Sequence, residues 1–235
     1  MAKSRMEGRI KEFALKHGAD VAGIAPVGRF EEAPKGFHPK DVLPEAQSVI
    51  VIGKCYPLAV LKGKSMTAMT KVTETIFDAL DACAYEICCF VEALGGRALP
   101  IPADAPYLYW DASRKHGMGD LSHRHAAVLA GLGSLGKNSL LLHPEFGNRL
   151  NLDSIVTTLS LEGDPLFEGA LCIGGCNLCI ESCPTGAIQE NGRVIQKRCR
   201  KVHGIKTLRG FELWACWECR KVCPVRERVL GYTKK

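Results

Sequence analysis

The chain has 235 residues, of which 46% are hydrophobic and 24% are charged. This apolar content excludes a disordered chain, and charged side chains interrupt every apolar run before the roughly 18 residues that a membrane span needs. The net charge of +6 comes from the tail, because residues 191–235 hold 13 basic and 3 acidic side chains, against 18 and 22 in residues 1–190. We expect this tail to face nucleic acid, an acidic redox partner or an anionic centre of its own domain, unless it is plain solvated surface.

The pattern of apolar residues predicts interleaved helices and strands. Ile10, Phe13 and Ala14 recur at helical spacing before Gly18, whereas the continuous β-branched run at 48–56 is typical of a buried strand. In chain order we predict a helix over 4–17, a strand over 20–25, a loop over 27–47, a strand over 48–56, a helix over 66–94, a strand over 98–102, an aromatic loop over 103–120, a helix over 121–130, and strands over 140–143 and 152–161. This order indicates an α/β or α+β layer structure.

The composition changes near residue 172, where Cys, Gly and Pro replace the apolar periodicity. We therefore predict two domains, an α/β domain over residues 1–165 and a smaller cysteine-rich domain over residues 166–235. No apolar signal segment follows the charged N-terminus, so we expect a cytoplasmic protein without a membrane partner.

Cysteine is the unusual residue of this sequence, with 12 copies. Thiols stay reduced in the cytoplasm, so clustered cysteines there are expected to be metal ligands or catalysts rather than disulfides. The pattern Cys-x2-Cys-x3-Cys-Pro occurs twice, at residues 176–184 and 216–224. In two-cluster ferredoxins the cysteine before proline ligates the other cluster of the pair, so the two runs are expected to cross.

This crossed arrangement predicts two [4Fe–4S] clusters, one held by Cys172, Cys176, Cys179 and Cys223, the other by Cys183, Cys199, Cys216 and Cys219. Three residues separate Cys172 from Cys176 where the usual spacing is two, an excess that Gly174 and Gly175 are expected to absorb. Zinc is the alternative, since Cys-x2-Cys pairs also build sites of four thiolates around that ion. Basic neighbours of Cys199 are expected to offset cluster charge: Lys197, Arg198, Arg200 and Lys201. The other thiols are expected to be buried structural groups: Cys55, Cys83, Cys88 and Cys89.

Residues 131–136 match the spacing Gly-x-Gly-x-x-Gly, which in a dinucleotide-binding fold follows a strand. Here the segment follows a predicted helix, and no acidic residue stands at the expected later position. It also lacks the Gly-Lys-Ser/Thr of a phosphate-binding loop. Nucleotide binding is therefore disfavoured, and we expect these glycines to let a large flat ligand approach the backbone.

Several stretches resemble the epoxyqueuosine reductases and the related reductive dehalogenases. They are AGLGSLGKNSLLLHPEFGNRL at 130–150, VTTLSL at 156–161, FALKHGADVAGIAP at 13–26, AQSVIVIGKCYP at 46–57, and the double cysteine run. The resemblance covers nearly the whole chain.

The resemblance implies a nitroreductase-like cobalamin-binding domain followed by a two-cluster ferredoxin-like domain. In such proteins electrons pass through the clusters to cobalt, which reduces the substrate. It further implies a small-molecule substrate and a low-potential electron donor such as ferredoxin or flavodoxin. By this resemblance the corrin would be lined by Gly131, Gly133, Gly136, Lys137 and Asn138, with His123 or Arg124 meeting a corrin carboxamide or a substrate anion.

The proton donor is the part of the resemblance that this sequence does not reproduce. Epoxyqueuosine reductases use an aspartate a few residues ahead of the arginine that matches Arg124, and here Gly117 stands at that place. Asp111 and Asp120 are near but out of register. Reductive dehalogenases use a tyrosine with a basic neighbour, for which the candidates are Tyr107 and Tyr109 with Arg114 and Lys115. Cleavage of a C–O or C–halogen bond leaves an anion, so an acid is required.

Three functions follow from these observations. The first is a corrinoid-dependent iron–sulfur reductase that removes a leaving group from a small molecule. The second is a ferredoxin-like electron-transfer protein that serves a corrinoid partner, which the missing acid at Gly117 favours. The third is epoxyqueuosine reduction on tRNA, which the basic tail keeps open.

Overall fold

The protein is built around one four-stranded antiparallel sheet. The computed structural model describes residues 2–107, 109–113 and 116–227. The strand order is β1–β2–β8–β3, and each neighbouring pair runs antiparallel. The bounds of these strands are Val21–Pro26 for β1, Ser48–Cys55 for β2, Ala98–Ile101 for β3 and Leu150–Thr157 for β8. The predicted mixture of helices and sheet is confirmed, in its α+β form.

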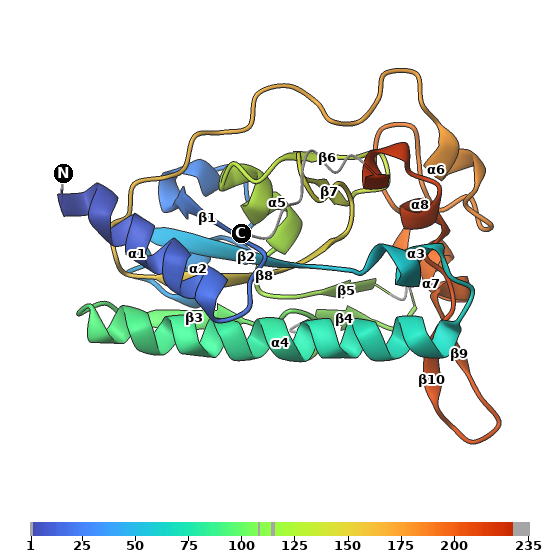
Figure 1. Cartoon of the computed structure of the whole chain (residues 1–235), viewed down its shortest axis with the longest axis horizontal. Coiled ribbons are helices and arrows are strands. Elements are labelled where there is room, and N and C mark those ends of the chain that lie inside the picture. The colour runs from blue at the N-terminus through green and yellow to red at the C-terminus, as the bar shows by residue number, and fades with distance from the viewer. Residues whose placement is uncertain (1, 108, 114–115, 228–235) are drawn as a thin grey trace.

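Both faces of the sheet are covered, so β8 is buried along its whole length and β2 along most of its length. Ile50 and Ile52 of β2 pack with helices α1 (Ala2–Lys16) and α4 (Met66–Ala93), whereas Val49 and Val51 point to the opposite face. There they meet α5 (His123–Leu129), η1 (Val27–Phe30) and the segments around them. Figure 1 shows the long α4 beneath the sheet and α5 above it.

The remaining elements of the first part of the chain are short. The predicted loop over 27–47 contains η1 and α2 (Pro39–Val42), and α3 (Leu58–Lys62) follows β2. The predicted loop over 103–120 contains the hairpin β4–β5 (Tyr109–Asp111 and His116–Met118), and a second small hairpin pairs β6 (Ser134–Leu135) with β7 (Leu141–Leu142). The strand predicted over 140–143 contains β7, whereas β4, β5 and β6 were not predicted, because strands of two or three residues are too short to carry a period-2 pattern.

The cysteine-rich part lies at one end of the sheet. An extended segment leaves β8 and runs along the molecule to α6 (Leu178–Glu181), after which come α7 (Gln196–His203), β9 (Gly204–Lys206), β10 (Glu212–Trp214), α8 (Glu218–Lys221) and η2 (Pro224–Glu227) (Figure 1). Among the described helices, none is both long and apolar enough to pass through a bilayer.

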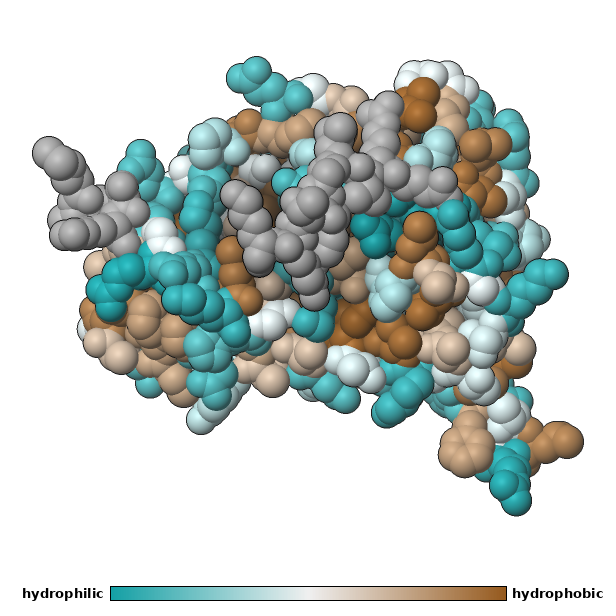
Figure 2. Space-filling view, viewed as in Figure 1, coloured by the Kyte–Doolittle hydropathy of each residue, from teal (hydrophilic) through white to brown (hydrophobic). Residues whose placement is uncertain are grey.

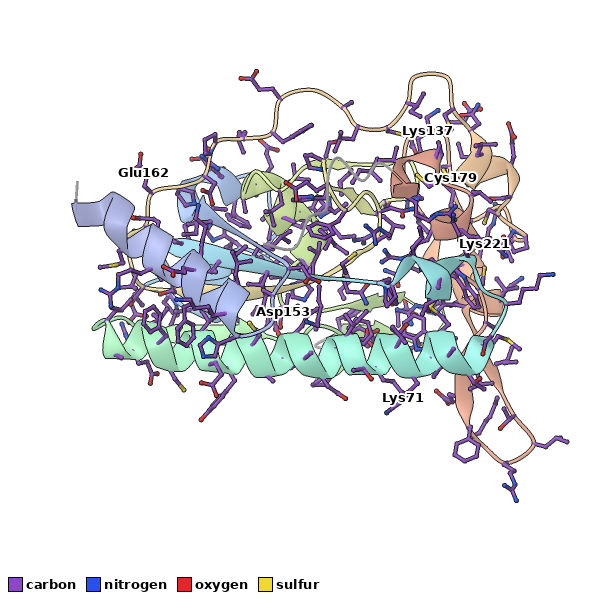
Figure 3. The ribbon with its side chains drawn as sticks, in the orientation of Figure 1. Lys71, Lys137, Asp153, Glu162, Cys179 and Lys221 are labelled. Atoms are coloured by element: carbon purple, nitrogen blue, oxygen red, sulfur yellow. The ribbon has the colours of Figure 1, made fainter. Side chains whose placement is uncertain are left out.

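Asp153 is a fully buried carboxylic acid in the middle of β8, on the side that faces α4 (Figure 3). One oxygen accepts from the backbone N–H of Ser154, and the other has no hydrogen-bond partner among the described residues. Burial raises the pKa of Asp153 to about 8, and the neighbouring Asp81 carboxylate adds to the increase. The folded protein therefore holds this acid in its protonated form at neutral pH.

We expect Asp153→Asn to become more stable relative to the wild type as the pH rises. Between pH 3.8 and about pH 8 the unfolded chain has lost this proton and the folded chain has kept it. The wild-type free energy of unfolding then falls with rising pH, by at most about 1.4 kcal/mol per pH unit, and the asparagine removes that loss. Denaturant titrations from about pH 5 to about pH 8 measure the difference. The exposed Asp78→Asn on α4 is the control, and a gap between wild type and Asp153→Asn that is constant with pH would contradict the assignment.

Candidate functional site

The eight cysteines of the two runs come together as two sets of four, each drawn from both runs. The first set rims one cavity together with Gly136, Lys137 and Asn138; it consists of Cys172, Cys176, Cys179 and Cys223. Burial raises the pKa of Cys179, and repulsion from the other three thiols adds to it. The cysteine before the second proline thus joins the first Cys-x2-Cys pair.

The second set consists of Cys183, Cys199, Cys216 and Cys219. Burial raises the pKa of Cys199, and repulsion from Cys216 and Cys183 raises it further. Burial also raises the pKa of Cys219 to about 12; the Arg220 guanidinium opposes this, while nearby Cys199 and Cys216 add to it. Cys179 of the first set lies within electrostatic range of Cys219, so the two sets are neighbours.

Backbone geometry shapes the surroundings of two of these thiols. Burial opposes the ionisation of Cys183, but backbone N–H groups and the Thr185 hydroxyl outweigh it and lower its pKa. Among these donors, the N–H of Ala187 lies 3.2 Å from the Cys183 sulfur. Gly175, at φ +71°, closes the turn in which the Cys176 N–H donates to Ile173, and it accommodates the extra residue after Cys172.

The glycine-rich segment uses its glycines for packing within the chain. A Cβ on Gly131 would stand 2.1 Å from the Pro165 oxygen, and one on Gly133 would stand 2.0 Å from the Leu142 oxygen. Both residues also have positive φ angles, +74° and +147°. These contacts account for both glycines without a ligand, and their expected contact with a corrin stays a prediction.

Lys137 and Asn138 connect this segment to the cysteine runs. The Lys137 ammonium donates to the Cys176 oxygen at 3.0 Å and to the Asn177 side chain at 2.6 Å. The Asn138 amide donates to the Cys219 oxygen at 3.1 Å. Figure 3 shows Lys137 beside Cys179 at this end of the molecule. With Gly136 they line the first cysteine cavity, a role that the sequence did not indicate.

A second cavity lies beside the β4–β5 hairpin. Its lining includes Tyr107, Asp120 and His123 from the predicted site, together with Asp104. The Tyr107 hydroxyl donates to Asp104 at 2.8 Å. Burial raises the pKa of Tyr107, and the bond to Asp104 adds to the increase. The cavity therefore has a protonated phenol and two carboxylic side chains on its wall.

The other predicted residues are placed differently. Tyr109 is 44% exposed and is not part of the lining of this cavity. Both ring nitrogens of His123 have protein partners, the Ser154 hydroxyl at 2.9 Å and the Pro102 oxygen at 3.0 Å, and burial lowers its pKa. Arg124 is exposed and donates to the Ser139 oxygen at 2.7 Å. Arg114 and Lys115 lie outside the described residues.

Gly117 is hydrogen-bonded to Gln196 and lies against Arg200, both in the cysteine-rich part of the chain. The Gln196 side chain accepts from the Gly117 N–H at 3.1 Å and donates to its oxygen at 3.2 Å. A Cβ on Gly117 would stand 3.2 Å from the Trp110 ring and 3.3 Å from the Arg200 guanidinium. A side chain at this position would require the Trp110 ring and the Arg200 guanidinium to move by a few tenths of an ångström.

Arg200 joins the second cysteine set to the second cavity. It follows Cys199 on α7, and its guanidinium carbon lies 4.8 Å from the Trp110 ring centre and 5.6 Å from that of Tyr107. Such contacts are favourable because the ring faces carry negative charge density. The aromatic loop and the basic run were both visible in the sequence, but their pairing was not.

Three of the four remaining cysteines are buried or half-buried, and one is exposed. Cys83 and Cys88 are buried and Cys55 is half-buried, but Cys89 is exposed, which corrects the expectation for it. Consecutive residues on a helix point about 100° apart, so Cys89 faces solvent where Cys88 faces the sheet.

Curated relatives bear the name that the sequence suggested. Residues of this chain are 32% identical over 117 positions to the epoxyqueuosine reductase of Bacillus cereus, a match that covers 45% of this chain and 30% of that protein. The identity to the epoxyqueuosine reductase of Synechococcus sp. is 38% over 112 positions, and this match covers 43% of this chain and 34% of that protein. The match thus spans about a third of the relatives' length. No protein-family profile matches the chain.

Solved structures share the fold over nearly the whole chain. A selenomethionine-labelled epoxyqueuosine reductase superposes with a TM-score of 0.65 at 22% identity, covering 96% of this chain and 67% of that one. A catabolic reductive dehalogenase superposes with a TM-score of 0.67 at 20% identity, covering 94% of this chain and 32% of that one. A dehalogenase described as B12-dependent superposes with a TM-score of 0.63 at 21% identity, covering 92% of this chain and 31% of that one. The resemblance inferred from the sequence is confirmed, and the fold is that of these reductases.

Proposed function

We propose that the protein is an iron–sulfur reductase with two [4Fe–4S] clusters, which acts with a corrinoid to remove a leaving group from a small molecule. The observation that carries the proposal is the assembly of eight cysteines into two crossed sets beside a small-molecule cavity. The relatives named epoxyqueuosine reductase support reductive chemistry.

The cysteine sets suit clusters better than zinc. Four thiols that line one shared cavity would surround a polynuclear group, whereas a zinc ion needs its sulfurs about 2.3 Å from one point. Among the described residues, no three His, Cys, Asp or Glu side chains converge in that way. The N–H to sulfur bond at Cys183 is of the kind that stabilises cluster thiolates. Such clusters would supply one-electron transfer at low potential.

The corrinoid part of the proposal rests on the neighbour described as B12-dependent. The cavity beside Tyr107 is lined by two short segments, within residues 101–107 and 119–123, and does not enclose a corrin, so we derive no step through that group. Tyr107 keeps its proton at neutral pH, because its pKa is raised, and holds it at the cavity wall. We assign Tyr107 as the proton donor to the leaving group and Asp120 as the residue that orients the substrate. Tyr109 does not line the cavity and has no role in this assignment.

Two other functions keep a specific observation in their favour. An electron-transfer protein for a corrinoid partner is favoured by Gly117, which Trp110 and Arg200 cover where the family has its acid. Epoxyqueuosine reduction on tRNA is favoured by the named relatives, one of whose solved structures holds a tRNA stem loop. The twelve free thiols suit a reducing cytoplasm in each case.

Analysis of anaerobically prepared protein tests the proposal. We expect about eight iron and eight sulfide per chain, and a cobalt spectrum that changes on reduction after incubation with cobalamin. Zinc in place of iron would overturn the cluster assignment. Iron without retained corrinoid would favour the electron-transfer protein, and rescue of a strain that lacks epoxyqueuosine reductase would favour the tRNA substrate.

A further inference from the structure

The hairpin β9–β10 projects from the body of the molecule, past the end of α4 (Figure 1). Its turn is closed by its own bonds, since the Thr207 N–H donates to Phe211 at 2.8 Å and the Gly210 N–H donates to Thr207 at 2.9 Å. Its root is held by Trp214, whose N–H donates to the Thr70 hydroxyl of α4 at 2.8 Å. The hairpin is therefore an ordered arm anchored to the body.

Three apolar side chains of this arm face water. Leu208 at the turn is completely exposed, at 109%, while Phe211 is 64% exposed and Ile205 is 44% exposed. Figure 2 shows this apolar tip at the lower right, beside hydrophilic atoms. Burial of such side chains is worth about 1.5–3 kcal/mol each, so an arm that offers three of them to solvent is typical of a docking surface.

The arm and the helix before it are basic. Over residues 196–214 there are six Lys and Arg and one acidic residue, Glu212. Five of the six cations are exposed: Lys197, Arg198, Lys201, Lys206 and Arg209. Within the described chain, Lys206 and Arg209 make no ion pair. A protein partner that complements this surface would carry negative charge.

The arm is also the connection between two members of the second cysteine set. Helix α7 carries Cys199 and leads directly into β9, and Cys216 stands two residues after the end of β10. A molecule bound to the arm therefore lies beside the second cysteine set, on the outer surface of the protein.

We propose that the β9–β10 arm is the docking site of an acidic, one-electron carrier protein that supplies electrons through the second cysteine set. This inference rests on the proposed function. In each encounter the reduced carrier would lose one electron to the oxidised centre, and no bond would form or break. The exposed Leu208, Phe211 and Ile205 favour a protein over RNA, because interfaces with nucleic acid are more polar and are built on phosphate contacts.

Binding to the iron-loaded protein tests this proposal, with a purified acidic bacterial ferredoxin and a flavodoxin as probes. We expect Lys206→Glu with Arg209→Glu, and separately Leu208→Ser with Phe211→Ser, to weaken binding of at least one probe about tenfold or more at low salt. The controls carry equivalent changes of charge or hydrophobicity elsewhere: Lys35→Glu with Lys40→Glu, and Leu15→Ser with Tyr85→Ser, all at exposed positions. These should stay within about twofold of the wild type.

Three results would overturn the proposal. They are no binding of either probe at low salt, equal losses in arm and control variants, and a loss confined to binding of bulk tRNA, which would assign the arm to nucleic acid. Iron content is measured on each sample first. Absence of iron would count against the proposed function, whereas full iron with unchanged affinity would count against the docking site alone.

Discussion

Replacing Cys176 and Cys223 together by alanine is expected to remove one iron–sulfur centre and to leave the other intact. The two residues belong to different sequence runs, but both rim the first cavity. A cubane cluster held by four thiolates does not survive the loss of two, so iron should fall from about eight to about four per chain. Anaerobic iron and sulfide analysis, with the spectrum of the reduced clusters, measures this.

The informative comparison is a pair of cysteines that lie in the same sequence run. Cys176 and Cys183 stand in one run but belong to different sets, so Cys176→Ala with Cys183→Ala should damage both centres. Cys89→Ala, at an exposed position of α4, is the control and should keep all iron. If Cys176→Ala with Cys183→Ala loses half of the iron and Cys176→Ala with Cys223→Ala loses all of it, the ligand sets do not cross.

The long elements were predictable because each carries its own periodic pattern. The helix expected over 66–94 is α4, and the strand expected over 48–56 is β2, to within a residue or two. The grouping of the cysteines into two crossed sets also follows from a local pattern, the cysteine before each proline, while their role as cluster ligands stays a prediction. Local patterns of this kind do not depend on the rest of the fold.

The site around the glycines could not be predicted, because the groups that decide it are distant in sequence. Gly131 is required by Pro165, and Gly117 is covered by Arg200. A Gly-x-Gly spacing looks the same whether a ligand or the chain's own backbone approaches it. The sheet order β1–β2–β8–β3 has the same character, since strand pairing is a long-range property.

Arg220 connects the cysteine helix α8 to the start of β8. Its guanidinium donates to the Asn148 and Leu150 oxygens, and to the Asn151 side chain at 3.0 Å. Its carbon also lies 5.3 Å from the ring centre of the buried Tyr56. The Asn148 amide returns a bond to the Arg220 oxygen at 3.0 Å. One side chain thus holds Cys219 of the second set against the sheet.

We expect Arg220→Met to destabilise the protein by about 3 kcal/mol, because methionine keeps the apolar stem but leaves buried carbonyl oxygens without donors. The apparent melting temperature of the anaerobic holoprotein should fall by about 6–12 °C. Arg220→Lys keeps the charge without the planar fork, so it should fall in between. Lys221→Met, which removes a surface pair with Glu218, should change stability by less than about 1 kcal/mol. Equal melting temperatures for the two methionine variants would show that α8 is held by its asparagine contacts and not by Arg220.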